Sequence, residues 1–407
     1  MSGTITEVES ETSEARRGFG ALWSSAAVSS VGDGAYVAAA PLLAAFLTRD
    51  PIGVAVVSAA AAAPWFLVGF WSGAIVDRFP RRSVLVVSEV VRGVALAALV
   101  GLILVDRASI PLLAATSFLV VTGQCFSDAA AQAMLPHVVG RSQDELAKAN
   151  GRLFASETVG KSLVGPPLGG IVFSAAPWAP FALDSASFAA SAALVAKVSS
   201  PPPPKSAQAQ TLTAAVKEGF RYLLRDRILL LLAFCLMVYN LAYNLAAATL
   251  VLFATSILHV SDFGFGLLLA AAAVGAAATG WISAPLVRLL TLKGAVVAAC
   301  LIQGAAWLGI AATSSAWIAA GAFVLLGATS TLVTVAVVSA RQKLVPDHLL
   351  GRVVSAFRLI GNGAAPIGSM LGGLVATSAG LRAPMVAAAA FTAAAVAVLA
   401  ALLFGRR

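Results

Sequence analysis

Residues 73 to 82 read GAIVDRFPRR and lie between two long apolar segments, near 52–76 and 83–105. Each flanking segment has about the 20 mostly apolar residues that a helix needs to cross a membrane. Basic residues collect in the cytoplasmic loops of membrane proteins, so the stretch predicts two transmembrane helices joined by a tight cytoplasmic turn. Its characteristic positions are Gly73, Asp77, Arg78, Arg81 and Arg82.

The composition extends this prediction to the whole chain. Of 407 residues, 59% are hydrophobic and 11% are charged, and the mean hydropathy is +0.92. An ordinary globular protein carries roughly 25% charged residues, and a soluble core cannot absorb this much apolar surface. We therefore expect an all-α integral protein of the cell membrane, embedded in the lipid bilayer.

Twelve segments are long and apolar enough to span the bilayer, and they predict a multi-pass protein. They lie near 19–47, 52–76, 83–105, 110–135, 149–175, 178–198, 228–256, 263–288, 292–313, 316–340, 352–378 and 380–404. With the N-terminus placed inside, 21 of the 27 Lys and Arg residues fall on the cytoplasmic side. This asymmetry predicts that both termini are cytoplasmic, and it explains the net charge of +9 without a nucleic-acid partner.

The longest polar stretch divides the spans into two sets of six. We expect a cytoplasmic tail at 1–18, a first six-helix bundle at 19–198, a cytoplasmic linker at 199–227, a second bundle at 228–404 and a cytoplasmic end at 405–407. Within the linker, VKEGFRYLLRDR predicts an amphipathic helix on the inner membrane surface.

The two sets of spans resemble each other in sequence. Gly151, Arg152 and Pro166 recur 200 residues later as Gly351, Arg352 and Pro366, and Gly53, Gly69 and Arg82 recur 211 residues later as Gly264, Gly280 and Lys293. Repeated six-helix bundles of this kind build transporters whose substrate site lies between the repeats.

GAIVDRFPRR resembles the loop signature of the major facilitator superfamily. The resemblance implies twelve helices in two pseudo-symmetric bundles and a conformational latch, in which Asp77 meets the start of the eleventh helix when the cytoplasmic side closes. The alternative is a plain basic turn. The stretches SVGDG (30–34), FALDSASF (181–188) and LVPDHLLGRV (344–353) are similar to the enterobactin-exporter-like and macrolide-efflux-like group, the transmembrane secretion effectors.

GPPLGG at 165–170 resembles the core of an antiporter motif found in exporters of this superfamily. The matching positions are Gly165, Pro166, Gly169 and Gly170. Small residues let two helices approach closely, and proline bends a helix. The upstream glycines Gly151 and Gly160 stand one residue early, and Lys161 occupies the place of one of them.

Ionisable residues inside a membrane are costly and predict function. Asp33, Glu157 and Lys161 are the candidates for proton coupling. Glu157 and Lys161 stand four residues apart, so they predict either a structural ion pair or an acid whose proton affinity changes when the lysine moves. Asp33 is either a proton carrier or a hydrogen-bonding residue within the bundle. Asp184 is expected to be structural, and Glu89 with Arg92 a local pair.

The candidates for substrate contact are polar residues on helices expected to line a central cavity. They are Gln124, Asp128, Tyr239, Asn240, Tyr243, Asn244, Arg358 and Asn362. The alternative role for these side chains is to join helices by hydrogen bonds. The remaining expected lining is apolar, which suits amphipathic organic molecules better than sugars.

Together these features predict a secondary transporter that works by alternating access. Our leading prediction is a monomeric exporter that exchanges protons for small amphipathic molecules such as drugs, natural products or siderophores. A proton-coupled importer is the alternative, and a membrane-embedded enzyme is a distant one, because no HExxH or other catalytic constellation is present. We expect no cofactor and no metal. ASETVGKS at 155–162 has the spacing of a nucleotide-binding loop, but it lies inside an apolar helix without a preceding strand.

Overall fold

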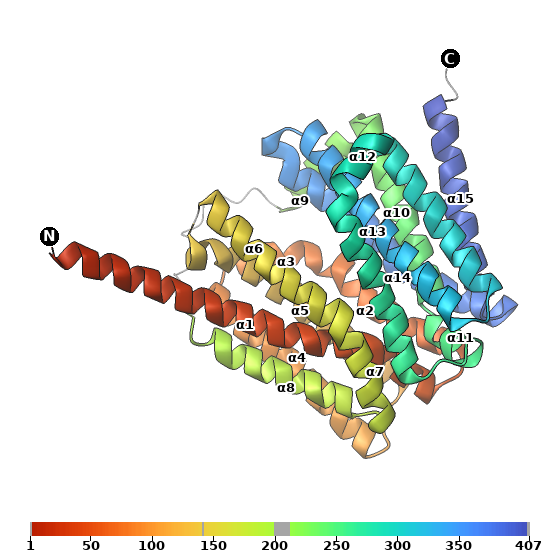
Figure 1. Cartoon of the computed structure of the whole chain (residues 1–407), viewed down its shortest axis with the longest axis horizontal. Coiled ribbons are helices and arrows are strands. Elements are labelled where there is room, and N and C mark those ends of the chain that lie inside the picture. Colours follow the sequence, from red (N-terminus) through yellow and green to blue (C-terminus); the bar gives the residue numbers. More distant parts are fainter. Residues whose placement is uncertain (1, 141, 199–211, 405–407) are drawn as a thin grey trace.

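The computed structural model describes residues 2–140, 142–198 and 212–404, and every regular element in these ranges is helical. This confirms the predicted all-α fold class (Figure 1). The opening of the predicted linker, 199–211, and the predicted C-terminal end, 405–407, lie outside the described residues.

The first half of the chain forms eight α-helices and one π-helical turn in the described ranges. They are α1 (Ser2–Leu47), α2 (Pro51–Leu67), α3 (Gly69–Val76), α4 (Arg81–Leu104), α5 (Ile110–Val139), α6 (Gln143–Glu157), η1 (Thr158–Val164), α7 (Gly165–Ala175) and α8 (Ala179–Val195). Helix α1 begins at Ser2, so the predicted tail at 1–18 continues the first transmembrane helix.

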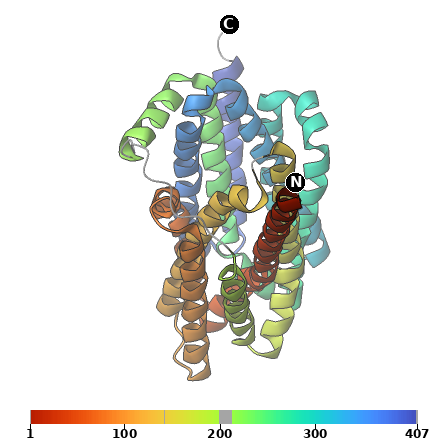
Figure 2. The same ribbon diagram turned by 90° about the vertical axis from the view of Figure 1, so that its left-hand side faces the viewer.

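The second half contains α9 and the helices that follow it. They are α9 (Leu212–Arg225), α10 (Arg227–Ala247), α11 (Leu250–Ser256), α12 (Asp262–Ala312), α13 (Ala316–Leu344), α14 (Asp347–Ala379) and α15 (Ala383–Phe404). The two halves form two groups of helices that lie side by side (Figures 1 and 2).

Eight helical segments of the described ranges are long and apolar enough to cross a membrane, and three shorter apolar helices accompany them. The twelve-span count therefore stays a prediction. Two adjacent predicted spans, 263–288 and 292–313, run together in α12 around a kink at Thr291, whose φ of 63° is not helical. Three other predicted spans are divided between shorter elements, as α2 with α3, α6 with η1 and α7, and α10 with α11.

Prolines account for one of these divisions. Pro166 and Pro167 directly follow η1. A proline cannot donate the helical hydrogen bond, and its ring crowds the carbonyl four residues earlier. A π turn is a common way to accommodate such a defect inside an α-helix.

The buried apolar side chains of the described residues form three clusters, and their distribution shows how the halves meet. One cluster draws on both halves, including Leu43 of α1 and Phe253 of α11. The other two belong to one half each, around Met134 in the first and Phe357 in the second. The halves are thus joined at the end that carries residues 48–50, which we call the outer end. They have separate cores at the end that carries residues 77–80, the inner end.

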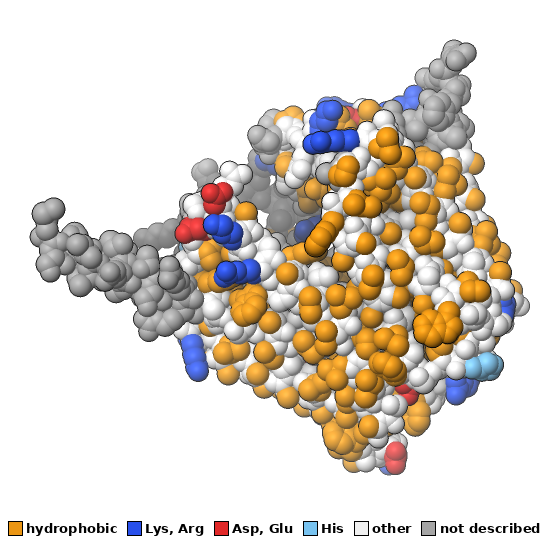
Figure 3. All heavy atoms as spheres, in the orientation of Figure 1, with side chains coloured by type: hydrophobic (Ala, Val, Ile, Leu, Met, Phe, Trp, Pro, Cys, Tyr) orange, Lys and Arg blue, Asp and Glu red, His pale blue; other side chains and the backbone are white. Residues whose placement is uncertain are grey.

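The surface agrees with this arrangement. In the view of Figure 3, hydrophobic side chains cover the flank of the molecule and charged side chains gather at its ends. The same view shows a hollow between the two halves at the inner end. Trp281 and Trp317 are largely exposed on the flanks, as expected for side chains that face lipid. The structure is therefore open at its inner end.

Helix α7 joins the halves through its glycines. A methyl group on Gly165 would overlap the backbone of Gly34 in α1, and one on Gly169 would overlap Ala35. On the other side of α7, one on Gly170 would overlap Asp262 in α12. Because α1 belongs to the first half and α12 to the second, GPPLGG packs α7 between the two halves at the outer end.

The second half repeats this contact. GSMLGG at 368–373 of α14 places Gly368 and Gly372 against Leu241 and Leu245 of α10, and Gly373 against Pro51 of α2. Gly373 thus contacts α2 as Gly170 contacts α12. By these contacts, GSMLGG is the structural equivalent of GPPLGG and follows it by 203 residues. The repeat predicted from Pro166 and Pro366 had a spacing of 200 residues.

We predict that Gly169→Ala lowers the melting temperature of the purified protein in detergent. The added methyl group has no room beside the Ala35 backbone, and overpacking of this kind costs about 1–3 kcal/mol. Gly101→Ala is the matched control, since a methyl group there meets nothing within 4 Å. Equal melting temperatures for the two variants would contradict the close packing of α7 on α1.

Candidate functional site

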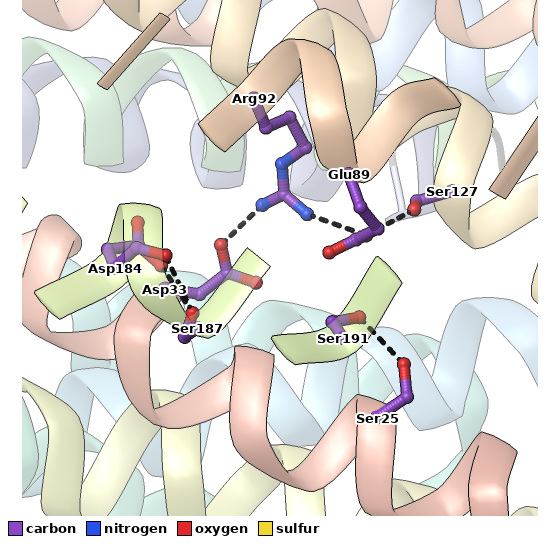
Figure 4. A network of polar contacts seen from close by, with 8 residues as sticks. All are labelled: Ser25, Asp33, Glu89, Arg92, Ser127, Asp184, Ser187 and Ser191. Atoms are coloured by element: carbon purple, nitrogen blue, oxygen red, sulfur yellow. Dashed lines mark hydrogen bonds and ion pairs between the residues drawn. The ribbon is translucent and has the colours of Figure 1, made fainter. Parts of the chain in front are cut away.

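A buried arginine on α4 organises the polar centre of the first half. Arg92 is 2% exposed and forms an ion pair with Asp33 of α1. Its guanidinium carbon also lies 3.9 Å from the ring centroid of Phe188 on α8. Space for the side chain comes from Gly123 of α5, where a methyl group would overlap the Arg92 Cγ and Cδ atoms. The arginine therefore joins four helices (Figure 4).

Glu89 adds a second carboxylate to this centre. Arg92 Nη1 donates to Glu89 Oε1 over 3.4 Å, which is the local pair predicted from sequence. Ser127 of α5 donates to the same oxygen over 2.6 Å. The other oxygen, Oε2, has no hydrogen-bond partner among the described residues, although Glu89 is only 4% exposed.

Asp184 of α8 is a third buried carboxyl group close to the same centre. It is 0% exposed, and its Oδ1 accepts a hydrogen bond of 3.1 Å from Ser187. Gly32 of α1 leaves room for it, because a methyl group there would overlap the carboxylate. Among these four ionisable groups, three carboxyl groups face one guanidinium.

Two cavities meet at Asp33. The N-bundle cavity, about 720 Å³, is lined by α1, α4, α5, α6 and α8 of the first half. The central cavity, about 430 Å³, lies between the halves and is lined by α1, α2, α5, η1, α10 and α14. Asp33 and Gln124 line both cavities. Asp33 is thus positioned to respond to occupancy of either one.

The structure does not form the predicted pair of Glu157 and Lys161. Glu157 ends α6 and lines the N-bundle cavity, whereas Lys161 lies in η1 and lines the central cavity. The ion pairs among the described residues do not include them. The sequence argument assumed an α-helix, in which residues four apart share a face, and the π turn that starts at Thr158 breaks that register.

The predicted substrate contacts divide into two groups. Asn244, Asn362 and Gln124 line the central cavity. A third cavity of about 640 Å³ lies between α3, α5 and α14 and is lined by Asp128 and Arg358, and it shares Asn362 with the central cavity. Asp128 also lines the N-bundle cavity.

The other predicted contacts join helices in this structure. Tyr239 forms a 3.0 Å hydrogen bond with Thr329 of α13, and Asn240 donates to the Gly361 carbonyl of α14 over 3.3 Å. The Tyr243 ring packs edge-on against Trp307 of α12. A role in substrate binding stays a prediction for all of these residues.

Among the described residues, the ion pairs do not join the predicted latch residue Asp77 to the start of α14. Asp77 and Arg78 are exposed, and Asp77 caps α3 through its backbone N–H. Arg352 at the start of α14 forms an ion pair with Glu218 of α9 instead. Arg82 donates to the Val198 carbonyl over 3.5 Å. A latch that closes the inner end is expected to be apart when that end is open.

Helix α9, which contains the predicted amphipathic segment of the linker, packs against the second half. Leu223 is fully buried in the core of the second half, and Tyr222 donates to the Leu344 carbonyl over 3.1 Å. Gly219 lies against the Arg352 backbone. The amphipathic pattern predicted the helix but not the surface that its apolar face contacts, because an apolar face can pack on a membrane or on a protein groove.

Comparison with known proteins places these features in a family. The family model described as transmembrane secretion effector matches residues 14–405. The multidrug efflux pump Tap of Mycolicibacterium fortuitum is 24% identical over 371 residues, with 88% of each chain covered.

Two solved transporter structures show the same fold at low identity. A mutant of the nucleoside transporter NupG aligns with a TM-score of 0.77 at 10% identity, over 94% of this chain and 100% of its own. A bacterial homologue of the human lysosomal transporter Spinster, in an inward-facing state, aligns with a TM-score of 0.73 at 16% identity, over 94% and 96%.

We predict that Arg92→Met strongly destabilises the protein, by about 3–5 kcal/mol, because it leaves Asp33 and Glu89 buried without their counter-ion. Thermal unfolding in detergent measures the loss. Adding Asp33→Asn and Glu89→Gln to the same chain is expected to recover part of it, whereas Arg107→Met on an outer loop changes little. If the triple variant is no more stable than Arg92→Met, the ion pairs do not stabilise the centre.

Proposed function

The chain belongs to the transmembrane secretion effectors, which are membrane transporters of the major facilitator superfamily and not enzymes, and we propose that it is a proton-coupled exporter of small amphipathic molecules. In this proposal it resides in the plasma membrane with both termini in the cytoplasm. Substrate enters from the inner end and leaves at the outer end.

The observation that carries proton coupling is the surplus of carboxyl groups around Arg92. Asp33, Glu89 and Asp184 are buried in the apolar part of the bundle with one guanidinium between them. Burying an ionised carboxylate without a counter-ion costs several kcal/mol. Protons can compensate the carboxylate charge that the single Arg92 guanidinium does not neutralise. Asp33 can exchange its proton with either cavity, because it lines both.

Export and amphipathic cargo rest on separate support. The relative Tap is a multidrug efflux pump and aligns over 88% of this chain. The central cavity is lined by apolar side chains such as Val57 and Trp65, with a few polar groups including Asn244 and Asn362. A mostly apolar wall with few polar groups suits a small amphipathic ligand.

Alternating access follows from the two kinds of contact between the halves. The outer end is closed by α7 on α12 and α14 on α2, and the inner end is open. Moving the halves about these contacts would bring Asp77 to the start of α14. An acid at a helix N-terminus is favourable by about 0.3–1 kcal/mol. Arg352 would then exchange Glu218 for the latch loop.

Import is the alternative, since the fold is shared with a nucleoside transporter. The direction of coupled movement separates the two proposals.

We predict that everted membrane vesicles accumulate an amphipathic dye, with ethidium as the probe, when their interior is made acidic. Collapse of the proton gradient with nigericin and valinomycin should abolish the accumulation. Asp33→Asn should remove the dependence on the gradient, whereas Asp106→Asn in an outer loop should retain it. Accumulation that survives complete collapse would rule out proton antiport, and accumulation only in right-side-out vesicles would favour import.

We also predict that Asp77→Asn increases the inward-open population roughly two- to fivefold, the ratio that corresponds to losing 0.3–1 kcal/mol. Glu218→Gln should act in the opposite direction, because it releases Arg352. Electron–electron resonance between spin labels at Lys148→Cys and Lys343→Cys measures the separation of the inner ends. Identical distance distributions in all three proteins would remove the latch from the mechanism.

A further inference from the structure

The N-bundle cavity is separate from the cavity between the halves. Its lining comes from the first half alone, and its volume of about 720 Å³ falls within the 300–1,000 Å³ that is usual for small-molecule sites. It meets the central cavity at Asp33 and Gln124. A ligand in the N-bundle cavity would therefore contact the proton-coupling centre from the side opposite the central cavity.

The charges on its wall are unequal. Four acids line it, and Arg92 is its one basic lining residue among the described residues. The acids are Asp33, Glu89, Asp128 and Glu157. Arg92 is already held by Asp33 and Glu89. Neither Asp128 nor Glu157 forms an ion pair with a described residue. Lys161 lies near enough to attract Asp128 electrostatically, but the acids of this wall still outnumber the bases around them.

A buried acceptor strengthens this reading beyond a count of acids. Glu89 is more than nine-tenths buried and lines the cavity, yet its Oε2 has no hydrogen-bond partner among the described residues. Its side chain extends from α4 into the space between α4 and α1 (Figure 4). A buried acceptor without a partner costs about 1–3 kcal/mol and favours a ligand or proton that supplies a positive charge or a donor.

The rest of the wall is apolar. Leu22, Leu85, Leu135, Leu146, Leu153 and Phe154 line the same cavity. Apolar side chains beside carboxylates match a ligand that carries both a cationic group and a hydrophobic body, since a hydrated metal ion would gain nothing from the leucines. An aromatic ring such as that of Phe154 also attracts cations.

We propose that the N-bundle cavity binds amphipathic organic cations, with Asp128 and Glu157 as the carboxylates that meet the cationic group, and that such cations are the exported substrates. The choice of substrate class rests on the proposed function, whereas the binding site does not. Cation and protons then compete for the same wall, which gives antiport a physical basis: occupancy by one favours release of the other.

The charged groups that face this cavity come from four elements. They are Asp33 of α1, Glu89 and Arg92 of α4, Asp128 of α5 and Glu157 of α6. Two bases lie outside the wall: Lys161 of η1 lines the central cavity and attracts Asp128, and Arg358 of α14 lines the third cavity together with Asp128. Asp184 of α8 lies behind the Asp33 centre. Since the acids of the wall outnumber the bases, binding of a cation should weaken as the pH falls.

Tetraphenylphosphonium and tetraphenylborate provide the test, because they have nearly the same size and shape and opposite charge. Binding of each to the purified full-length protein is measured by equilibrium dialysis at pH 8 and pH 5.5. We expect the cation to bind at least tenfold more tightly than the anion at pH 8, and less tightly at pH 5.5. Asp128→Asn and Glu157→Gln should each weaken cation binding about tenfold, a loss between the values for a charge–charge interaction in water and near a protein surface.

Asp144→Asn is the matched control, since it removes an exposed acid from the first turn of α6, far along the helix from Glu157. Binding of the variant should equal that of the unchanged protein, and melting temperatures show whether each variant is folded. Equal affinity for the two ions, or unchanged binding in both cavity variants, overturns the proposal. Tight cation binding without outward, proton-dependent transport in vesicles would instead overturn the proposed function and leave the binding site standing.

Discussion

The close approach of α7 to α1 and α12 is the constraint on which the rest of this structure depends. Gly165 and Gly169 let the backbone of α7 touch α1, and Gly170 lets it touch α12. Lipid tails are as apolar as leucine side chains, so helices in a membrane associate through packing rather than through the hydrophobic effect. Contacts between backbones give that packing at the lowest cost in side-chain entropy. These contacts close the outer end, while the two halves are apart at the inner end.

The same approach fixes where charge can be buried. Once α1 is held against η1 and α7, Asp33 lies opposite α4, and Gly32 and Gly123 leave the room in which Asp184 and Arg92 fit. An isolated guanidinium in the hydrocarbon core is costly, and here an ion pair, a hydrogen bond and an aromatic ring offset the cost. The small residues that pack the helices and the charged residues of the Arg92 centre are therefore parts of one arrangement.

The sequence predicted those features that depend on local spacing. The helices, the pair of Glu89 with Arg92 and the small residues of GPPLGG all follow from periodicity or from a short motif. The partnership of Asp33 with Arg92 could not be predicted, because 59 residues separate them and only packing brings α1 to α4. The sequence could not predict that Glu157 and Lys161 line different cavities, because the π turn depends on Pro166 and on crowding against α1. GSMLGG was readable as a second GPPLGG but lacks the prolines that draw attention to the first.

The two halves carry the same framework with different chemistry, and this difference indicates where coupling can occur. At the repeat spacing of 211 residues, Gln303 of α12 stands where Arg92 stands on α4. Gln303 is fully buried and donates to the Tyr239 carbonyl of α10 over 3.2 Å, while the Tyr239 hydroxyl bonds to Thr329. This network is neutral, whereas the Arg92 centre combines one guanidinium with three carboxyl groups. Because the two halves share the outer contacts of α7 and α14, a change of charge in the first half alone would alter the balance between them. In the proposed proton-coupled mechanism, the first half binds the proton and the second half is the stable surface against which it moves.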